Sequence, residues 1–380
     1  MTNEIEQQRE AWRQKAVKVG RDVLAPRAAE IDARGEFPWD IAEAFAQQGL
    51  LSLLIPKEFG GEDTDITSFC IVIDELAHYC VSSALMIIAH TVGMMPVVLV
   101  ESMELKESIL TRVTKGRTVF CFCLTEPEAG SDAASIRTKA LREGDHYLLN
   151  GRKCFITNGG VSDFYTIFAV TSSERKIEGI TGFVVEKGTP GLSIGKTEEK
   201  MGIRGSNTTE VILEDLRVPV AQRIGDEGVG WWLMMRTLNR SRPAIGALAV
   251  GLAQGALDYC IRFGRERGWA EGNPVGTPLM LADMAIEIEA ARTLVYKAAN
   301  MIDEKVKGIP VQMYSAMSKY FASDVAMKIA TNAVQMLGWQ GLVKGHPVER
   351  MMRDAKVIQI FEGTNQIQRV VIAHTLLKSR

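Results

Sequence analysis

One carboxylate in this sequence stands where a general base could be built. Glu362 directly precedes Gly363 and follows an apolar run at residues 357–360. A carboxylate held in an apolar cleft loses solvation, which raises its pKa towards the range in which a general base works. Taken alone, a glutamate at a helix end is usually a solvated surface residue, so this position needs support from other parts of the chain.

Two further polar clusters follow runs of β-forming residues. The segment LTEPEAGSD occupies residues 124–132, and TNGG occupies residues 157–160. Both combine hydroxyl side chains with glycine, and a polar loop at a strand end can present hydroxyl and amide groups to a ligand. Loops of this composition are also common as plain turns. Neither cluster therefore identifies a site by itself.

Several common catalytic and metal-binding patterns are missing from the sequence. It contains no G-x-S-x-G, no phosphate-binding P-loop and no H-E-x-x-H. Its six cysteines include no C-x-x-C pair, and Cys121 and Cys123 lie two apart in a strand-like run, which directs both thiols to one face without completing a metal site. We expect no bound metal and thiols used as small core residues.

The sequence pattern along the chain changes from helical to β-rich and back to helical. Helical spacing marks residues 4–31, 39–48, 66–80 and 82–99. Runs of β-forming residues follow at 118–124, 164–171, 180–186 and 209–213. Residues 146–157 are typical of a hairpin that turns at Asn150-Gly151, the pair favoured in type I′ turns.

Helical spacing returns after Gly230. In residues 281–305 the apolar positions step by three and four along one stripe, formed by Met284, Ile288, Ala291, Val295, Ala298 and Ile302. The order predicts a helical domain at 1–117, a β domain at 118–226 and a second helical domain at 227–380. A purely parallel α/β fold is not expected, because strands do not alternate with helices.

The overall charge excludes one broad class of function. The 44 Lys and Arg residues nearly balance the 46 Asp and Glu residues, giving a net charge of −2, whereas a nucleic-acid binder carries a basic face or tail. No apolar run approaches the roughly 18 residues of a membrane span, and the first residues lack the apolar core of a signal peptide. We expect a cytoplasmic protein that does not span a membrane.

Six motifs, taken together and in chain order, resemble the acyl-CoA dehydrogenase family of flavoproteins over essentially the whole length. They are LIPKEFGG (54–61), LTEPEAGSD (124–132), GRKCFITNGG (151–160), MGIRGS (201–206), RMMRDA (350–355) and FEGTNQIQ (361–368). The resemblance implies an α+β multidomain fold, with an N-terminal all-α domain, a middle β-barrel and a C-terminal four-helix bundle. It also implies a homotetramer, a dimer of dimers, with FAD between barrel and bundle and its adenosine end reaching a neighbouring subunit.

The same resemblance implies roles for individual residues. Those implied for FAD binding are Phe122, Leu124, Thr125, Gly130, Ser131, Phe155, Thr157, Arg267, Gln335, Thr364 and Gln366. Those implied for acyl-CoA binding are Ser131, Asn239, Arg242 and Gly363. The Thr125 hydroxyl would lie near flavin N5, and Phe155 stands where the family usually has tryptophan.

Glu362 matches the catalytic base of the family. The resemblance implies that Glu362 removes the α-proton of an acyl-CoA thioester while the β-hydrogen leaves as hydride to flavin N5, giving a 2-enoyl-CoA. An electron-transferring flavoprotein is the implied electron acceptor.

Two departures from the family pattern fall at the adenine end of the cofactor. The usual Arg-x-x-Phe-Gly is replaced by RGWAEGNPV at residues 267–275, and the usual Gln-x-x-Gly-Gly-x-Gly by QMLGWQG at 335–341. Trp269 or Trp339 could supply the missing aromatic stack. These departures leave open a flavin-poor acyl-thioester lyase or binding protein. An enoyl-CoA reductase running in reverse is a further alternative, and the sequence fixes neither the acyl chain nor the choice between CoA and acyl-carrier protein.

Overall fold

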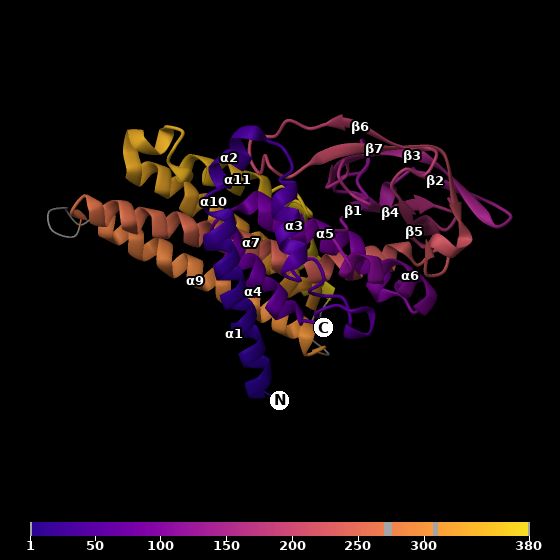
Figure 1. Cartoon of the computed structure of the whole chain (residues 1–380), viewed down its shortest axis with the longest axis horizontal. Coiled ribbons are helices and arrows are strands. Elements are labelled where there is room, and N and C mark those ends of the chain that lie inside the picture. The colour runs from indigo at the N-terminus through magenta and orange to yellow at the C-terminus, as the bar shows by residue number, and fades with distance from the viewer. Residues whose placement is uncertain (1, 270–275, 307–310, 379–380) are drawn as a thin grey trace.

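The computed structural model describes residues 2–269, 276–306 and 311–378. The sheet lies at one end of the molecule, the longest helices extend to the other end, and the N-terminal helices lie against them (Figure 1). The N-terminal elements are α1 (Thr2–Val19), the π-helix η1 (Gly20–Leu24), α2 (Ala28–Arg34), α3 (Trp39–Gln47), η2 (Lys57–Phe59), α4 (Ile66–Ala77), α5 (Val81–Leu99) and α6 (Met103–Thr114).

Eight strands and six later helical elements complete the described chain. The strands are β1 (Phe120–Cys123), β2 (Lys139–Glu143), β3 (His146–Thr157), β4 (Phe164–Val170), β5 (Ile180–Glu186), β6 (Leu192–Thr197), β7 (Thr208–Pro219) and β8 (Arg223–Ile224), with short 3-10 turns η3 (Ala133–Ser135), η4 (Lys176–Gly179) and η5 (Val220–Gln222). The later elements are α7 (Gly230–Glu266), α9 (Gly276–Asp303), α10 (Val311–Leu337), η6 (Gly338–Leu342), α11 (Pro347–Ile358) and α12 (Asn365–Lys378). The helical, β, helical order is confirmed, while the exact domain bounds stay a prediction.

The strands form one mixed sheet. Its order is β6-β7-β3-β2-β4-β5-β8, and β1 pairs in parallel with β4. Buried side chains from β1, β2, β3, β4, β5 and β7 pack into a single cluster, so the sheet wraps around its own core. Cys121 and Cys123 lie in that core with their Sγ atoms 3.6 Å apart, which confirms that both thiols face the same way. Among the described residues, no group of three or more potential ligands could hold a metal.

The predicted hairpin turn at Asn150-Gly151 is wrong. β3 runs unbroken through both residues, and the pairing with β7 shifts register between Leu149 and Gly151. The Asn150 side chain accepts a hydrogen bond from the backbone N–H of Asp215 at 2.8 Å and donates to the Asp215 carboxylate at 3.1 Å. The extra residue of this β-bulge lies on β7, where Glu214 and Asp215 face the single residue Asn150, and the Asn150 side chain holds the bulge across the strands.

The chain reverses direction at Gly144-Asp145 instead. Glu143 and His146 are paired at the end of the β2–β3 ladder, and Gly144 has φ = +65°. A two-residue hairpin turn needs a positive φ, which glycine adopts without steric cost. The sequence analysis also predicts no strand at β2, since KALRE is rich in helix formers. Pairing with β3 overrides that local preference.

The first predicted helix is interrupted. α1 ends at Val19, η1 follows, and α2 begins only at Ala28. Pro26 lies in the break, and proline has no N–H to continue a helical ladder. The stripe predicted in residues 281–305 is confirmed by the burial of Met284, Ile288, Ala291, Val295 and Ala298 in α9, whereas Ile302 is only half-buried.

The two helical parts of the chain share one hydrophobic core. Trp12 of α1, Phe69 of α4, Leu248 of α7 and Ile329 of α10 belong to the same buried cluster. A second cluster joins α5 and α6 to the sheet. The helices and the sheet are therefore packed as one body, and any site at their junction is held from both sides.

Two core helices differ from the expectation that no apolar run approaches the length of a membrane span. α5 and α7 pass a length and hydropathy test for a membrane span, but 89% and 78% of their apolar windows are buried inside the protein. Their apolar residues are used for packing against other helices and the sheet. Such burial is the environment of a core helix.

His90 links α5 to the strand that leads into the first polar cluster. Its Nε2 lies 2.8 Å from the carbonyl oxygen of Leu51, and its Nδ1 accepts from the N–H of Phe120 at 3.2 Å. This arrangement requires the neutral imidazole with the proton on Nε2. Burial lowers the pKa of His90 from 6.5 to about 4.

We expect His90 to make the protein sensitive to acid. Because its folded pKa lies below its unfolded value, its contribution is present above pH 6.5 and is lost as the pH falls towards 4. A gap of this size corresponds to about 3 kcal/mol of unfolding free energy. Urea unfolding of His90→Gln between pH 7 and 4 should show a flatter pH dependence than the wild type. The exposed His374→Gln is the control, and an equal slope in His90→Gln would contradict the assignment.

Candidate functional site

Glu362 lies in the short loop between α11 and α12. Glu362 has φ = +57° and Gly363 has φ = +85°, so two consecutive residues occupy the left-handed region. Glycine tolerates this conformation, whereas for glutamate it costs on the order of 1–3 kcal/mol and persists only where the surroundings enforce it. Strain of this kind is concentrated at functional sites. The loop therefore has a fixed, costly shape that directs the Glu362 side chain.

Glu362 is half-buried, and its carboxylate lacks a full set of partners. Its Oε2 is shielded from solvent and has no hydrogen-bond partner among the described residues. Burial raises the pKa of Glu362, and the nearby Arg242, Ser241 and Lys319 oppose only part of that shift. A desolvated carboxylate with a raised pKa can accept a proton from a bound molecule, which is the chemistry expected of a general base.

Arg242 of α7 lies near this carboxylate, and Asn239 is hydrogen-bonded to Arg242. Arg242 is buried, and its Nη1 donates to the Asn239 Oδ1 at 3.0 Å. In the part of the chain that the structure describes, its Nε has no partner. Burial lowers the pKa of Arg242, while the Glu362 charge opposes the shift. The site thus combines a carboxylate and a guanidinium that each keep one unsatisfied polar atom, available for a ligand.

A proline in α7 leaves the backbone carbonyl of Asn239 without its usual hydrogen bond within the helix. Pro243 has no N–H and cannot donate to the carbonyl four residues earlier, which belongs to Asn239. That carbonyl instead accepts a hydrogen bond from the Ser315 hydroxyl of α10 at 2.8 Å. The irregularity in α7 therefore ties it to α10 beside the Glu362 loop.

The residues predicted to flank the flavin lie at the ends of β1 and β3, which the structure brings together. The N–H of Cys154 donates to the carbonyl of Thr125 at 2.9 Å, and Thr157 pairs with Thr208 of β7. Phe122 is half-buried and packs with its ring 4.9 Å from that of Phe168. At these strand ends Phe122, Thr125 and Thr157 are half-buried and Phe155 is exposed, whereas Leu124 is buried.

Phe155 is displayed by a bulge in β3. The register with β7 shifts between Lys153 and Ile156, and Phe155 within the bulge has φ = +54°. Its side chain is 64% exposed. Bulges re-aim side chains next to binding sites, and an exposed aromatic ring held on a strained backbone is suited to stack on a planar ligand.

A buried ion pair missed by the sequence analysis holds these strand ends. Lys153 is completely buried, and its Nζ donates to the Glu126 Oε1 at 2.7 Å and to the Leu124 carbonyl at 3.1 Å. The Glu126 carboxylate also accepts from the N–H groups of Arg137 and Thr138, at 2.6 and 3.0 Å. The pair fixes the start of the 124–132 loop to β3.

Residues 127–128 and 130–132 of the 124–132 loop are exposed, whereas Ala129 is buried. Gly130 and Ser131 are exposed, so both are accessible to a ligand. Thr364 and Gly363 are half-buried beside Glu362, and Gln366 is exposed in the first turn of α12. The Thr364 hydroxyl accepts from the N–H of Ile367 at 3.2 Å and caps α12.

Arg267 and Gln335 belong to a different end of the molecule. Both are exposed, and Arg267 lies 25 residues after Arg242, which amounts to roughly 38 Å along a helix. The Arg267 Nη2 donates to Gln340 at 3.2 Å, so the polar partner in the chain is Gln340. The structure does not bring Arg267 or Gln335 next to Glu362 of the same chain.

The two tryptophans at this end differ in environment. Trp269 packs with its ring 5.7 Å from that of Phe263, whereas Trp339 is 74% exposed. Of the two proposed replacements for the missing aromatic stack, Trp269 is therefore engaged within its own chain and Trp339 is free to contact a ligand. Ala270 and the rest of the substituted segment, to residue 275, lie outside the described residues.

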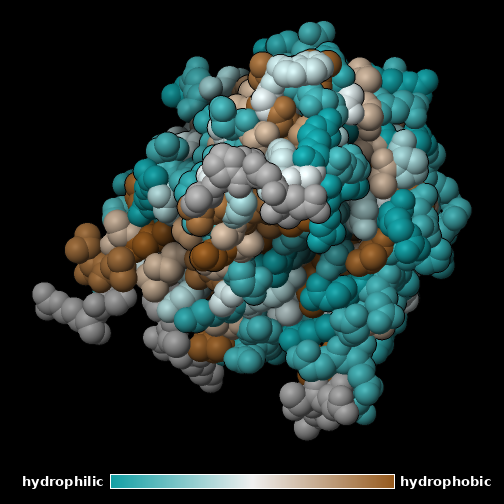
Figure 2. Space-filling model, turned by 90° about the vertical axis from the view of Figure 1, so that its left-hand side faces the viewer, coloured by the Kyte–Doolittle hydropathy of each residue, from teal (hydrophilic) through white to brown (hydrophobic). Residues whose placement is uncertain are grey.

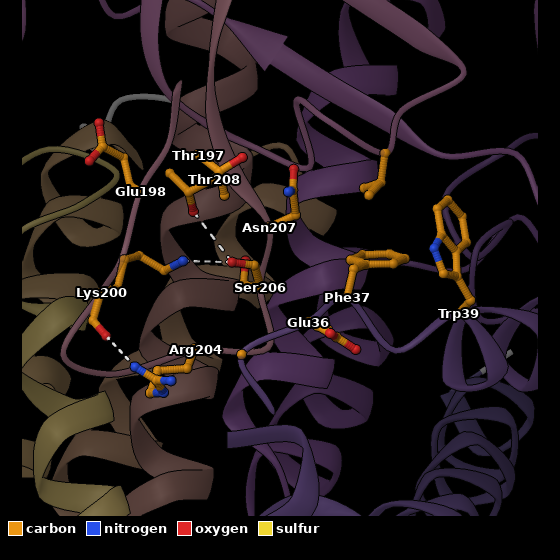
Figure 3. Close-up of a pocket in the computed structure, with 12 residues that line it drawn as sticks. Glu36, Phe37, Trp39, Thr197, Glu198, Lys200, Arg204, Ser206, Asn207 and Thr208 are labelled. Carbon is orange, nitrogen blue, oxygen red and sulfur yellow. Dashed lines mark hydrogen bonds between the residues drawn. The ribbon is translucent and has the colours of Figure 1, made fainter. Parts of the chain in front are cut away.

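A cavity of about 400 Å³ lies beside the TNGG turn (Figure 3). Lys200 and Arg204 lie on one side of it and Phe37 and Trp39 on the other. Asn207 of its wall accepts a hydrogen bond from the N–H of Gly160 at 2.8 Å. None of the predicted site residues is among the described residues that line this cavity.

Comparison with known proteins gives three matches that follow one another along the chain. Residues 6–117 match "Acyl-CoA dehydrogenase, N-terminal domain", residues 121–216 match the middle domain and residues 228–377 match the C-terminal domain. Cyclohex-1-ene-1-carbonyl-CoA dehydrogenase of Syntrophus aciditrophicus is 46% identical over 93% of this chain and 86% of its own length. The short-chain specific acyl-CoA dehydrogenase of Clostridium acetobutylicum is 40% identical over 98% and 99%.

Solved structures give the same result. Butyryl-CoA dehydrogenase of Megasphaera elsdenii superposes with a TM-score of 0.91 at 36% identity, covering 97% of this chain and 98% of its own. A chain from work on the electron-transferring flavoprotein of Acidaminococcus fermentans reaches 0.92 at 37% identity, with the same coverage. A chain from the FAD complex of PigA reaches 0.89 at 26% identity, covering 97% of both chains.

Proposed function

This chain belongs to the acyl-CoA dehydrogenase family and is an FAD-dependent oxidoreductase that dehydrogenates acyl-CoA thioesters, and we propose that Glu362 is its catalytic base. One observation carries the assignment of Glu362: a fully buried carboxylate oxygen without a partner, on a backbone held in a costly conformation. A purely structural glutamate would be hydrogen-bonded or solvated. The unsatisfied oxygen is therefore available for a proton of the substrate.

The residues around Glu362 define what each would do in the reaction. Glu362 takes the α-proton of the thioester, and its raised pKa makes it a stronger base than a solvated carboxylate. Arg242, whose Nε has no partner among the described residues, and Asn239, which is bonded to Arg242, suit the polar CoA part of the substrate. Burial keeps water from the carboxylate and so protects the proton transfer.

The strand-end surface fits the flavin. The exposed Phe155 ring and the half-buried Phe122 flank the hydroxyl residues Thr125 and Thr157 at one edge of the sheet, which suits a planar ring with polar edges. When bound there, FAD accepts the β-hydrogen of the substrate as hydride. We further propose that Gly130, Ser131, Thr364 and Gln366 hold the rest of the cofactor, since all four are accessible next to these two groups.

Anaerobic titration with acyl-CoA thioesters tests the proposed function. Adding a saturated acyl-CoA to the FAD-loaded protein should bleach the flavin absorbance and yield one enoyl-CoA per flavin. A thioester with two methyl groups on the α-carbon has no proton for Glu362 and should leave the spectrum unchanged. Protein that stays oxidised with every saturated acyl-CoA supplied would contradict the proposal.

The two alternatives left open by the sequence are not favoured. The named relatives are dehydrogenases, which speaks against a flavin-poor lyase or binding protein and against a reductase as the main activity. The titration separates these functions as well. A lyase would convert its thioester without any change in the flavin spectrum, and a reductase would oxidise the pre-reduced flavin with an enoyl-CoA but not bleach it with an acyl-CoA.

We also propose a homotetramer built through the C-terminal helices. Figure 2 views the end of the molecule where Figure 1 labels α9, α10 and α11, and it shows apolar patches there. Several of the larger exposed apolar side chains lie on the C-terminal helical elements: Leu279, Ile286, Phe321, Trp339, Leu342, Val370, Leu376 and Leu377. Arg267 and Gln335 lie too far from Glu362 to serve the same cofactor in one chain, so a neighbouring subunit would supply them. Sedimentation velocity of Leu377→Glu against the wild type tests the assembly.

An electron-transferring flavoprotein is the proposed acceptor, and the cytoplasm the proposed location. One similar chain comes from work on such a flavoprotein, and the six cysteines are buried and unpaired, as is usual for cytosolic proteins. Steady-state turnover with the purified flavoprotein as sole acceptor tests the first proposal. Fractionation of the producing cells tests the second.

A further inference from the structure

A second buried charge, Lys319, lies directly beneath the Glu362 loop. Lys319 belongs to α10, and its side chain is 0% exposed. Its Nζ donates to the carbonyl of Gly363 and to the Oδ1 of Asn365, both at 2.9 Å. Both acceptors are neutral, and burying an ammonium group without a paired carboxylate is costly. A lysine retained at such a position calls for a role beyond packing.

The contacts of Lys319 fall on the strained part of the loop. The Gly363 carbonyl, which Lys319 holds, also accepts from the Gln368 side chain at 3.0 Å, and Asn365 donates to Ser323 and to Asp324, at 2.8 and 2.7 Å. These bonds connect the loop to α10 and α12 at several points. They supply the constraint that two consecutive left-handed residues require.

Lys319 also belongs to the electrostatic surroundings of Glu362. The charged groups that face the pair come from each neighbouring element: Arg242 from α7, Asp324 from α10 itself, and Arg369 from α12, which lies 3.8 Å from Asp324. Burial lowers the pKa of Lys319 to about 7, while Glu362 favours its charged form. The ammonium in turn favours the Glu362 carboxylate, so the two groups influence each other's charge.

We propose that Lys319 is the positioning residue of the Glu362 base, holding the loop through Gly363 and Asn365 and stabilising the carboxylate by its charge. This inference rests on the proposed function. The Lys319 Nζ is directed to the loop, where it donates to Gly363 and Asn365. It acts through Glu362, both by geometry and by charge.

Three lysine variants test the proposal by stopped-flow reduction of the FAD-loaded protein. In Lys319→Met we expect flavin reduction to slow by about 10- to 100-fold because the base is misplaced, with a KM for acyl-CoA changed by less than about threefold. The acid limb of the pH–rate profile should move to higher pH by about one unit, because loss of a nearby cation raises the pKa of a carboxylate. In Lys319→Arg the acid limb should return to its wild-type position. Lys328 is an exposed lysine of the same helix, and Lys328→Met should leave both the rate of flavin reduction and the pH–rate profile unchanged.

Two further measurements keep the inference separate from the proposed function. The infrared band lost in Glu362→Gln reports the titration of that carboxyl without any turnover, and its midpoint should rise in Lys319→Met. An unchanged midpoint overturns the inference even if the protein reduces no flavin, whereas an inactive wild type with a shifted midpoint overturns only the proposed function. If Lys319→Met does not fold, Asn365→Ala, which removes one acceptor of the ammonium, should slow flavin reduction, and an unchanged rate would overturn the positioning role.

Discussion

Glu362→Gln is expected to lower the rate of acyl-CoA dehydrogenation by about 10²–10⁴-fold, the usual contribution of a general base. Glutamine has nearly the shape of glutamate but cannot accept the α-proton. The loop, Arg242 and the strand ends that we assign to FAD are unchanged by the substitution, so the variant should still bind FAD. Flavin reduction in a stopped-flow instrument and the flavin content of the purified variant measure the two quantities separately.

The same variant makes a second, opposite prediction for stability. Burial raises the pKa of Glu362 above its unfolded value, so ionisation of this group destabilises the folded protein as the pH rises through the unfolded pKa. Glu362→Gln should therefore unfold at the same or a higher urea concentration than the wild type at pH 7. A base that lowers stability while it serves catalysis is the usual trade-off at an active site.

Glu304→Gln is the matched control for both measurements. Glu304 is exposed at the end of α9, so its replacement should change neither flavin reduction nor the urea midpoint. Flavin reduction by Glu362→Gln at the wild-type rate would exclude Glu362 as the base. A large loss of flavin in the variant would instead show that the residue supports the cofactor.

The pH dependence of the wild type follows from the same shift. The carboxylate must be ionised to accept a proton, so flavin reduction should increase as the pH rises through a pKa that lies above the ordinary value of 4.5. The sequence shows only that this carboxylate follows an apolar run, whose Ile360 is exposed in the structure. The sequence does not show the partners of the carboxylate, Ser241 and Lys319, because they come from helices more than 40 positions away.

Local patterns predict the class of each segment better than its ends or its pairing. The stripe in α9 is readable because a helix that buries one face must repeat its apolar residues every three or four positions. The Asn150-Gly151 turn fails for the opposite reason. Its preference for a turn is local, whereas the bonds between Asn150 and Asp215 join residues 65 positions apart.

Two buried lysines, Lys319 and Lys153, occupy positions where the sequence pattern of their helix or strand predicts an apolar residue. Lys319 occupies the same face of α10 as the buried Ala316, Ala322 and Ala326, at the three- and four-residue spacing of a core stripe. Lys153 lies on the same side of β3 as Tyr147, Leu149 and Gly151, at the two-residue spacing of a strand. A charged residue at an apolar position of either pattern is a sign of a buried partner, although the sequence does not say which partner it has.

The second large effect is expected for Lys153→Met, which should lower the free energy of unfolding by about 3–5 kcal/mol. The substitution removes the ammonium from a buried ion pair and leaves the Glu126 carboxylate inside the protein without a counter-charge. Glu126 keeps its hydrogen bonds from Arg137 and Thr138, which limits the loss but does not neutralise the charge. Urea unfolding at pH 7 measures it, and Lys187→Met, an exposed lysine just after β5, should stay within about 0.5 kcal/mol of the wild type.

A double variant separates the charge from the packing. Glu126→Gln with Lys153→Met removes both charges, so its loss should be smaller than the sum of the two single losses, since neither partner leaves the other uncompensated. Because Lys153 also holds the Leu124 carbonyl, both variants that lack it should bind FAD more weakly than the wild type. Additive losses would show that the two side chains do not interact energetically.

Acid should reduce the difference between Lys153→Met and the wild type. Burial raises the pKa of Glu126, but the charge of Lys153 and the hydrogen bonds to the carboxylate outweigh it and lower the net pKa below 4.5. The stabilisation that the carboxylate provides is therefore present above the unfolded pKa and is lost as the pH falls through the folded one. In Lys153→Met the same carboxylate lacks its cation, protonates at a higher pH and so relieves the unpaired charge. The urea midpoints of the two proteins should converge below pH 4.5, and midpoints that stay equally far apart at every pH would show that Lys153 acts through packing alone.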